Sequence, residues 1–141
     1  MVEKNLQTLF SAWVRANSAY FVNSTVWELK MEKGNAFAFD RVAEHQVNAL
    51  LQAKREGLYH KISDVPVSFG GKMRFTLQKP CDCLLVKGAD AYVVICFYKV
   101  RQPKETLWID IEKFLKVKAE SPRKSLTEAE AKYIAERIEV I

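Results

Sequence analysis

The sequence predicts a single α/β domain, residues 1–141, in which one mixed β-sheet is flanked by helices. Segments with helical and strand periodicity follow one another in the order helix, strand, helix, several strands, helix, which is typical of helices packed on a shared sheet. The chain is 49% hydrophobic over 141 residues, enough for one core and too short for two. It contains no internal repeat or low-complexity tract that would indicate another architecture.

Three helices are predicted from periodicity and capping signals. The first covers residues 3–16, where apolar residues recur at helical spacing before Asn17. The second covers residues 40–56, with Asp40 as N-cap, Gly57 as its end, and a buried side formed by Ala43, Val47, Leu50 and Leu51. The third begins at a capping-box pattern, Thr127 with Glu130, and packs through Ala131, Ile134, Ala135 and Ile138.

β-branched and aromatic residues predict strands at residues 20–31, 73–77, 81–86, 91–98 and 106–111. Residues 87–90 form a short connection, so strands 81–86 and 91–98 are expected to pair as a hairpin. The rest of residues 63–79 is expected to be a loop, and residues 113–124 a basic segment. Trp13, Trp27 and Trp108 are expected in the core.

Charge and composition narrow the classes of function. The chain has 22 Lys and Arg against 17 Asp and Glu, a net charge of +5 and a pI near 9.1, which suits a polyanionic partner. It has no run of about 18 apolar residues and no signal-peptide pattern, so we expect a cytoplasmic protein that does not enter the membrane. Cys81, Cys83 and Cys96 lack the spacing of a zinc site and are expected to be reduced thiols.

The strand at residues 20–31 carries a carboxylate and an amine at the spacing that places both on one face. Glu28 and Lys30 are two residues apart in Glu28-Leu29-Lys30, and side chains alternate along a strand. A carboxylate can hold Mg²⁺, and a neighbouring ammonium can orient water or offset charge during phosphodiester cleavage. Taken alone the triplet is a weak signal, because an exposed Glu-x-Lys on a strand more often marks a solvated face.

The context of this triplet resembles a known family. A Glu-x-Lys strand is followed by a helix that carries Glu44-His45-Gln46, and this arrangement over residues 26–58 is similar to the RecU-type Holliday junction resolvases of the PD-(D/E)xK nuclease superfamily. Residues 91–130, with Arg123-Lys124-Ser125-Leu126, resemble them more loosely. The resemblance implies a restriction-endonuclease-like core in which Glu28 ligates metal, Lys30 is the catalytic amine and Gln46 supports the site.

The sequence departs from that family at one catalytic position. The superfamily's first aspartate precedes the Glu-x-Lys strand, whereas this chain has no aspartate before Asp40. Asp82 is the best substitute, because it stands at the start of an apolar strand and resembles the family's aspartate. We therefore expect a rearranged sheet in which the strand of Asp82 lies beside that of Glu28, so that both carboxylates hold Mg²⁺ or Mn²⁺. A strand-start role for Asp82 remains an equal alternative.

Other polar residues are candidates for metal or nucleic-acid contact. Asp64 is a possible further metal ligand or a loop cap, while His45, Glu44 and Glu3 are minor candidates. DNA phosphates would be neutralised by cationic side chains without reading sequence. The residues predicted to bind nucleic acid are His60, Lys61, Lys72, Arg74, Lys79, Arg123 and Lys124, and Lys33, Lys113, Lys116 and Lys118 add charge. The Gly70-Gly71 loop is expected to enter a groove or the centre of a junction.

The resemblance implies a metal-dependent endonuclease that cuts four-way DNA junctions as a homodimer. Two-fold symmetry suits a reaction that cuts two strands of one junction. Two alternatives stay open at this point. The chain could cut other branched or single-stranded DNA, or it could be a catalytically inactive relative that binds nucleic acid or a protein.

Overall fold

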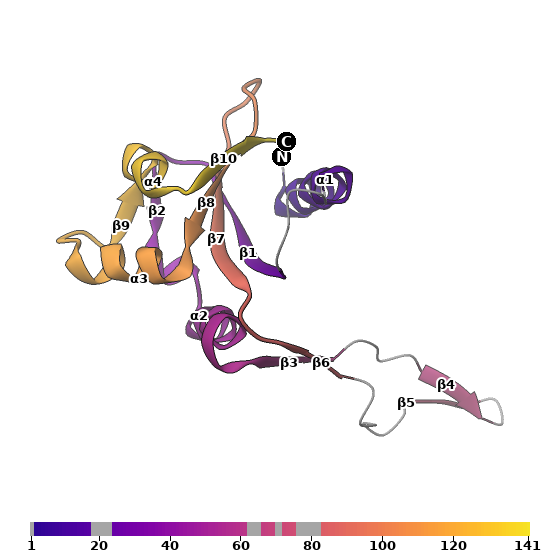
Figure 1. Cartoon of the computed structure of the whole chain (residues 1–141). Coiled ribbons are helices and arrows are strands. Elements are labelled where there is room, and N and C mark those ends of the chain that lie inside the picture. The colour runs from indigo at the N-terminus through magenta and orange to yellow at the C-terminus, as the bar shows by residue number, and fades with distance from the viewer. Residues whose placement is uncertain (1, 18–23, 62–65, 70–71, 76–82) are drawn as a thin grey trace.

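The structure is a computed structural model that describes residues 2–17, 24–61, 66–69, 72–75 and 83–141. Of residues 59–61, 66–69, 72–75 and 83–84 it describes the backbone alone. Its centre is a mixed four-stranded sheet in the order β1-β7-β8-β10 (Figure 1). The strands are β1 (Thr25–Glu32), β7 (Asp90–Phe97), β8 (Glu105–Asp110) and β10 (Arg137–Val140). The predicted α/β class, a mixed sheet flanked by helices, is thus confirmed.

β1 lies parallel to β7, while β7 with β8 and β8 with β10 are antiparallel. A parallel pair needs a long crossover, and here it includes a helix. The crossover contains β2 (Ala36–Ala38), a 3₁₀ turn η2 (Phe39–Arg41), α2 (Glu44–Leu51), a π-helical turn η3 (Gln52–Glu56) and β3 (Leu58–Lys61).

The side chains of β1 alternate between the two faces of the sheet. One face is apolar, and the other carries both apolar and charged residues. Leu29 and Met31 point to the face covered by α1 (Glu3–Ala16), as predicted for a first helix over residues 3–16. There Leu6 and Phe10 of α1 are buried against the central Trp108, whose ring centroid is 5.4 Å from that of Phe10. Trp13 and Trp27 pack on the same cluster, so all three tryptophans belong to the core.

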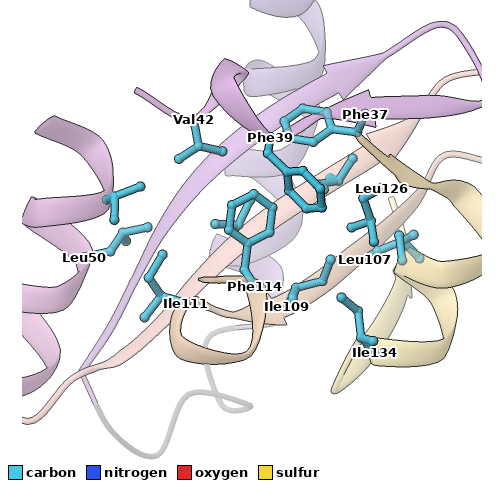
Figure 2. Packing of buried hydrophobic residues seen from close by; sticks show 14 of the residues in the cluster. Phe37, Phe39, Val42, Leu50, Leu107, Ile109, Ile111, Phe114, Leu126 and Ile134 are labelled. Carbon is cyan, nitrogen blue, oxygen red and sulfur yellow. The ribbon is translucent and has the colours of Figure 1, made fainter. Parts of the chain in front are cut away.

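The opposite face is covered by α2, α3 (Ile111–Glu120), α4 (Glu128–Ile134) and the small sheet of β2 with β9 (Ser125–Thr127). Figure 2 shows Phe39 of η2 and Phe114 of α3 meeting inside this core, with ring centroids 5.6 Å apart. Val47 and Leu50 contribute the predicted buried side of α2, and Leu51 packs beside them. This packing fixes α2 next to β1, where Glu28 and Lys30 also point.

The second helix begins later than predicted. Asp40 lies in η2 rather than at an N-cap, and Ala43 caps α2 instead. Residues 39–41 form the 3₁₀ turn, and Val42 and Ala43 have an extended backbone, so the α-helix begins only at Glu44. The predicted end is confirmed, because Gly57 has a φ of 111°, a conformation that only glycine adopts easily.

The predicted hairpin between residues 81–86 and 91–98 is wrong. The strand β6 (Cys83–Val86) pairs with β3, while β7 pairs with β1 and β8. The run from Val93 to Phe97 is buried on both faces, as in a central strand, and therefore takes a partner on each side. β3 and β6 form a ribbon that leads away from the main sheet (Figure 1).

Three further elements differ from the sequence prediction. The predicted loop contains β4 (Pro66–Phe69), paired with β5 (Lys72–Phe75), which overlaps the predicted strand 73–77. The predicted basic segment is largely α3, which Asp110 caps by accepting hydrogen bonds from the amides of Glu112 and Lys113. Ile138, predicted to pack the last helix, lies half-exposed in β10. The Thr127 and Glu130 capping box of α4 is confirmed.

Among the helices of the described ranges, none is long and apolar enough to cross a bilayer.

Candidate functional site

Glu28 and Lys30 lie together on the face of β1 that looks toward α2. The Nζ atom of Lys30 is 2.9 Å from Oε1 of Glu28, and their side chains are 13% and 27% exposed respectively. A salt bridge with this degree of burial is screened less than an exposed pair. The sequence spacing thus predicted the shared face correctly, and the two groups are in direct contact.

Gln46 of α2 joins both charged groups. Its Nε2 atom donates a hydrogen bond to Glu28 Oε1 at 2.7 Å, and its Oε1 atom accepts one from Lys30 Nζ at 3.1 Å. The amide therefore presents its donor to the carboxylate and its acceptor to the ammonium. The three residues, which we call the Glu28 cluster, come from two elements that are 16 to 18 positions apart in sequence.

The start of α2 fixes how Gln46 is presented. Gln46 Oε1 also accepts a hydrogen bond from the Ala43 amide at 3.0 Å, which satisfies a donor that the first turn leaves open. Because one amide oxygen binds both Ala43 and Lys30, the capping of the helix and the orientation of the ammonium depend on the same atom. A flipped amide would lose both of these bonds and would point an oxygen at Glu28.

Arg41 joins η2, the turn before α2, to the end of β1, a contact that the sequence did not predict. Its guanidinium donates to the Met31 carbonyl at 2.8 Å and to Glu32 Oε2 at 2.5 Å. It also lies over the Phe37 ring, 5.1 Å from the centroid. In sequence Arg41 is an ordinary exposed cation. Only the position of η2 beside β1 reveals its contacts.

The Glu28 carboxylate retains an oxygen for a further ligand. Oε1 is bound by Lys30 and Gln46, while Oε2 accepts no hydrogen bond from the described part of the chain. Mg²⁺ commonly uses one or two protein carboxylates together with water and substrate phosphate. A carboxylate oxygen of this kind can supply one ligand to such an ion. Glu28 is then the residue that would hold it.

The position of the second expected carboxylate lies outside the described residues. This applies to Asp82 and to Asp64. The strand that follows Asp82, β6, pairs with β3 and not with β1, so the expected placement of that strand beside the strand of Glu28 is wrong. Within the described ranges, no three or more His, Cys, Asp or Glu side chains are grouped as metal ligands.

The described residues that were predicted to contact nucleic acid lie in β3, in β5 and between α3 and β9. His60 and Lys61 lie in β3, and Lys72 and Arg74 in β5, where the backbone alone is described. Lys79 and the Gly70-Gly71 loop lie outside the described residues. Arg123 and Lys124 are exposed between α3 and β9, and Arg123 forms a salt bridge with Glu130.

The minor candidates are not part of the Glu28 cluster. Glu44 and His45 start α2 but are exposed, and Glu3 lies on α1, on the other side of the sheet. Cys96 is a buried free thiol, as expected of a structural cysteine, and its burial raises its pKa to about 11.

A second polar cluster ties η3 to the start of α3. Lys54 contacts both Asp110 and Glu112, and Arg55 also contacts Glu112. Burial lowers the pKa of Lys54, but hydrogen bonds to the two acids outweigh it, and the net pKa is raised. Hydrogen bonds from Arg55 and Lys54 lower the pKa of Glu112. Since each charge has an opposite partner, this cluster holds the fold together.

Comparison of the chain with models of protein families, with curated proteins and with solved structures finds no match.

Proposed function

We propose that this chain is a metal-dependent, structure-selective DNA endonuclease similar to the RecU-type Holliday junction resolvases. The observation that carries the proposal is the Glu28 cluster, in which a carboxylate, an ammonium and an amide from β1 and α2 meet within 3.1 Å of one another. These are the groups, on the strand and the helix, that the PD-(D/E)xK resemblance implies.

The order of elements around the cluster supports a restriction-endonuclease-like core. The strand with Glu-x-Lys is followed by a helix that supplies Gln46 and then by a parallel partner strand, β7. The cluster lies at an outer strand of the sheet, where a substrate as wide as DNA can approach. Its exposure of 27% at Glu28 leaves that carboxylate open to a ligand.

Each residue has a defined task in the proposed reaction. Glu28 would hold Mg²⁺ or Mn²⁺, which would supply the positive charge that polarises a phosphodiester and activates water. Lys30 places its ammonium beside the attacked phosphate and offsets the charge that builds up there. Gln46 holds the Lys30 ammonium and the Glu28 carboxylate in register, so that neither group must be reoriented as the reaction proceeds.

Binding of branched DNA would draw on basic surfaces on more than one element. The β3–β6 ribbon and the β4–β5 pair carry His60, Lys61, Lys72 and Arg74, and the net charge is +5. Such contacts would be independent of sequence and would weaken with salt. A homodimer would place two Glu28 clusters on one junction, and each would cut one strand.

The test is cleavage of a labelled four-way junction with Mg²⁺ or Mn²⁺, for the wild-type chain and for Glu28→Gln and Lys30→Ala. We expect metal-dependent cuts by the wild type and a loss of at least about 100-fold in rate for each variant, since both change groups beside the reacting phosphate. Glu44→Gln is the matched control, because it removes an exposed carboxylate at the start of α2, the helix that carries Gln46. It should cut at the wild-type rate.

Binding and cleavage must be measured separately. Glu28→Gln should still bind the junction, because phosphate contacts elsewhere supply affinity. A wild-type chain that binds junctions tightly but never cuts them with either ion would instead favour the inactive, DNA-binding relative. Cleavage of flaps or single strands in preference to junctions would favour the other nuclease substrates.

A further inference from the structure

A basic pocket lies on the same side of the sheet as the Glu28 cluster. A hollow of about 300 Å³ opens between the end of α3, η2 and the segment before β9. We propose that this hollow, the α3–β9 pocket, binds phosphate groups of the DNA backbone away from the cleaved bond. This proposal rests on the proposed function. The residues that matter are Phe39, Asp40, Lys118, Ser121, Arg123 and Lys124.

The charges of the α3–β9 pocket are available to an anion. Lys118 and Lys124 are exposed, and neither has a salt-bridge partner in the described part of the chain. Arg123 is paired with Glu130, so its charge is partly offset. Asp40 is the one acidic side chain lining the pocket among the described residues. Two exposed ammonium groups that line one hollow and have no acidic partner among the described residues give it a positive charge that attracts an anion.

The walls of the pocket are held in place by backbone contacts. The Phe39 amide donates to the Lys124 carbonyl at 3.1 Å, and β2 continues this contact as it pairs with β9. The Arg123 amide donates to the Ser121 hydroxyl at 3.2 Å, which fixes the turn after α3. Phe39 itself is buried against Phe114. A site with a fixed backbone loses little conformational entropy when it binds.

One short turn connects the pocket to the Glu28 cluster. Phe39 and Asp40, at the start of η2, line the pocket, and Arg41, at its end, binds the Met31 carbonyl beside Lys30. A DNA strand engaged at Glu28 can therefore continue over η2 into the pocket. Phosphate anchors away from the cut position the duplex without reading its sequence. The pocket would thus act on substrate affinity and leave the chemical step unchanged.

The experiment measures junction binding by fluorescence anisotropy with Ca²⁺ in place of Mg²⁺, over a range of salt concentrations. The test variant is Lys118→Ala/Lys124→Ala. The matched control is Lys4→Ala/Arg15→Ala, which removes the same charge from exposed positions of α1, on the other side of the sheet, that do not line the pocket. Each lost phosphate contact should reduce the slope of log affinity against log salt by about 0.9. Two lost contacts would make the loss of affinity about tenfold larger at 50 mM than at 200 mM salt.

Two further measurements test the charge of the pocket and its preference for DNA over free phosphate. Asp40→Asn removes the acid from the rim and should tighten junction binding. Inorganic phosphate, titrated without Ca²⁺ onto the chain free of DNA, should not bind at millimolar concentration if the pocket needs a polynucleotide. Phosphate binding to the wild type but not to the test variant, together with a wild-type salt slope in the test variant, would identify a site for free phosphate and overturn the DNA proposal.

The outcomes separate this inference from the proposed function. If the test variant keeps the wild-type salt slope, or if the control loses as much affinity, the pocket is not a DNA anchor, although Glu28-dependent cleavage can still stand. A wild-type chain that binds no junction overturns both proposals. Support requires a reduced slope in the test variant alone, with single-turnover cleavage at saturating enzyme equal to that of the wild type.

Discussion

At the scale of single residues, the orientation of the Gln46 side-chain amide decides which hydrogen bonds hold the Glu28 cluster together. Gln46 gives its donor to Glu28 and its acceptor to Lys30 and to the Ala43 amide. A side chain of equal size but different charge can satisfy only part of this pattern. The carboxylate of a glutamate would face the Glu28 carboxylate with no donor between them, and like charges at this separation repel strongly.

We therefore expect Gln46→Glu to reduce metal-dependent cleavage by about 10 to 100-fold, the loss that groups behind a metal ligand commonly cause. Gln46→Ala should lose less, because the direct contact of Lys30 with Glu28 survives. Single-turnover cleavage of a junction measures both. Asn48→Asp is the control, since it adds the same charge to an exposed position of α2. Equal rates for Gln46→Glu and wild type would contradict a bridging role.

Sequence reasoning reached this cluster but not its surroundings. The spacing of Glu28 and Lys30 predicted a common face, because strand side chains alternate. Gln46 was identified through a resemblance, and its hydrogen bonds match the expected supporting position. Arg41 could not be recognised, because its contacts with the Met31 carbonyl and with Glu32 depend on the position of η2 beside β1, which no local pattern predicts.

At the scale of elements, the exit from α2 sets the direction of the β3–β6 ribbon. α2 passes into the π-helical turn η3, and the Gly57 amide closes it on the Gln52 carbonyl at 2.6 Å. Gly57 then has φ 111° and ψ 132°, which L residues adopt only with strain. The backbone conformation at residue 57 therefore requires glycine. The β3–β6 ribbon begins directly after this turn, so its direction depends on Gly57.

Gly57→Ala should lower the free energy of unfolding by about 1 to 3 kcal/mol, the range for strained backbone positions. The new Cβ would lie 2.9 Å from Leu85 Cδ1, but Leu85 is half-exposed and can move, so most of the loss is backbone strain. Gly88→Ala is the comparison: an alanine at its φ of 68° is also strained, but this left-handed helical conformation is more accessible to L residues than φ 111°, and nothing crowds the new Cβ, so we expect a smaller loss. Urea unfolding compares them. A loss at Gly88 as large as that at Gly57 would contradict this account.

Pairing between elements could not be read from local sequence. The helices over residues 3–16 and after Thr127 follow from periodicity and a capping box, which are local signals. The pairing of β6 with β3 joins segments that are distant in sequence. β6 does not pair with β7, because both edges of β7 are occupied by β1 and β8. The short connection of residues 87–90 favoured a hairpin, but burial of β7 on both faces outweighed it.

At the scale of the whole molecule, acid stability depends on carboxylates that join different elements. Lys99, after β7, lowers the pKa of Glu128 in α4 through a hydrogen bond, and Lys132 adds to the effect. Arg55 and Lys54 lower that of Glu112. In α4, hydrogen bonds from Thr127 lower the pKa of Glu130. All three carboxylates are thus more acidic in the folded chain than in the unfolded one.

A carboxyl with a lowered folded pKa stabilises the fold above its unfolded pKa and loses that contribution as the pH falls through the folded value. We therefore expect the midpoint of thermal unfolding to be steady near neutral pH and to fall as the pH drops below about 4.5. Glu128→Gln should flatten this fall, as measured by calorimetry. Tyr133→Phe, at an exposed position of the same helix, should not. An equally steep fall in Glu128→Gln would contradict the assignment.

The most direct test of the central claim is a crystal of the chain grown with Mn²⁺ and measured for anomalous scattering. We expect a peak about 2 Å from Glu28 Oε2, with Lys30 and Gln46 in the contacts described above. An ordered Glu28 cluster without a peak, or a peak bound only to carboxylates remote from it, would contradict the claim.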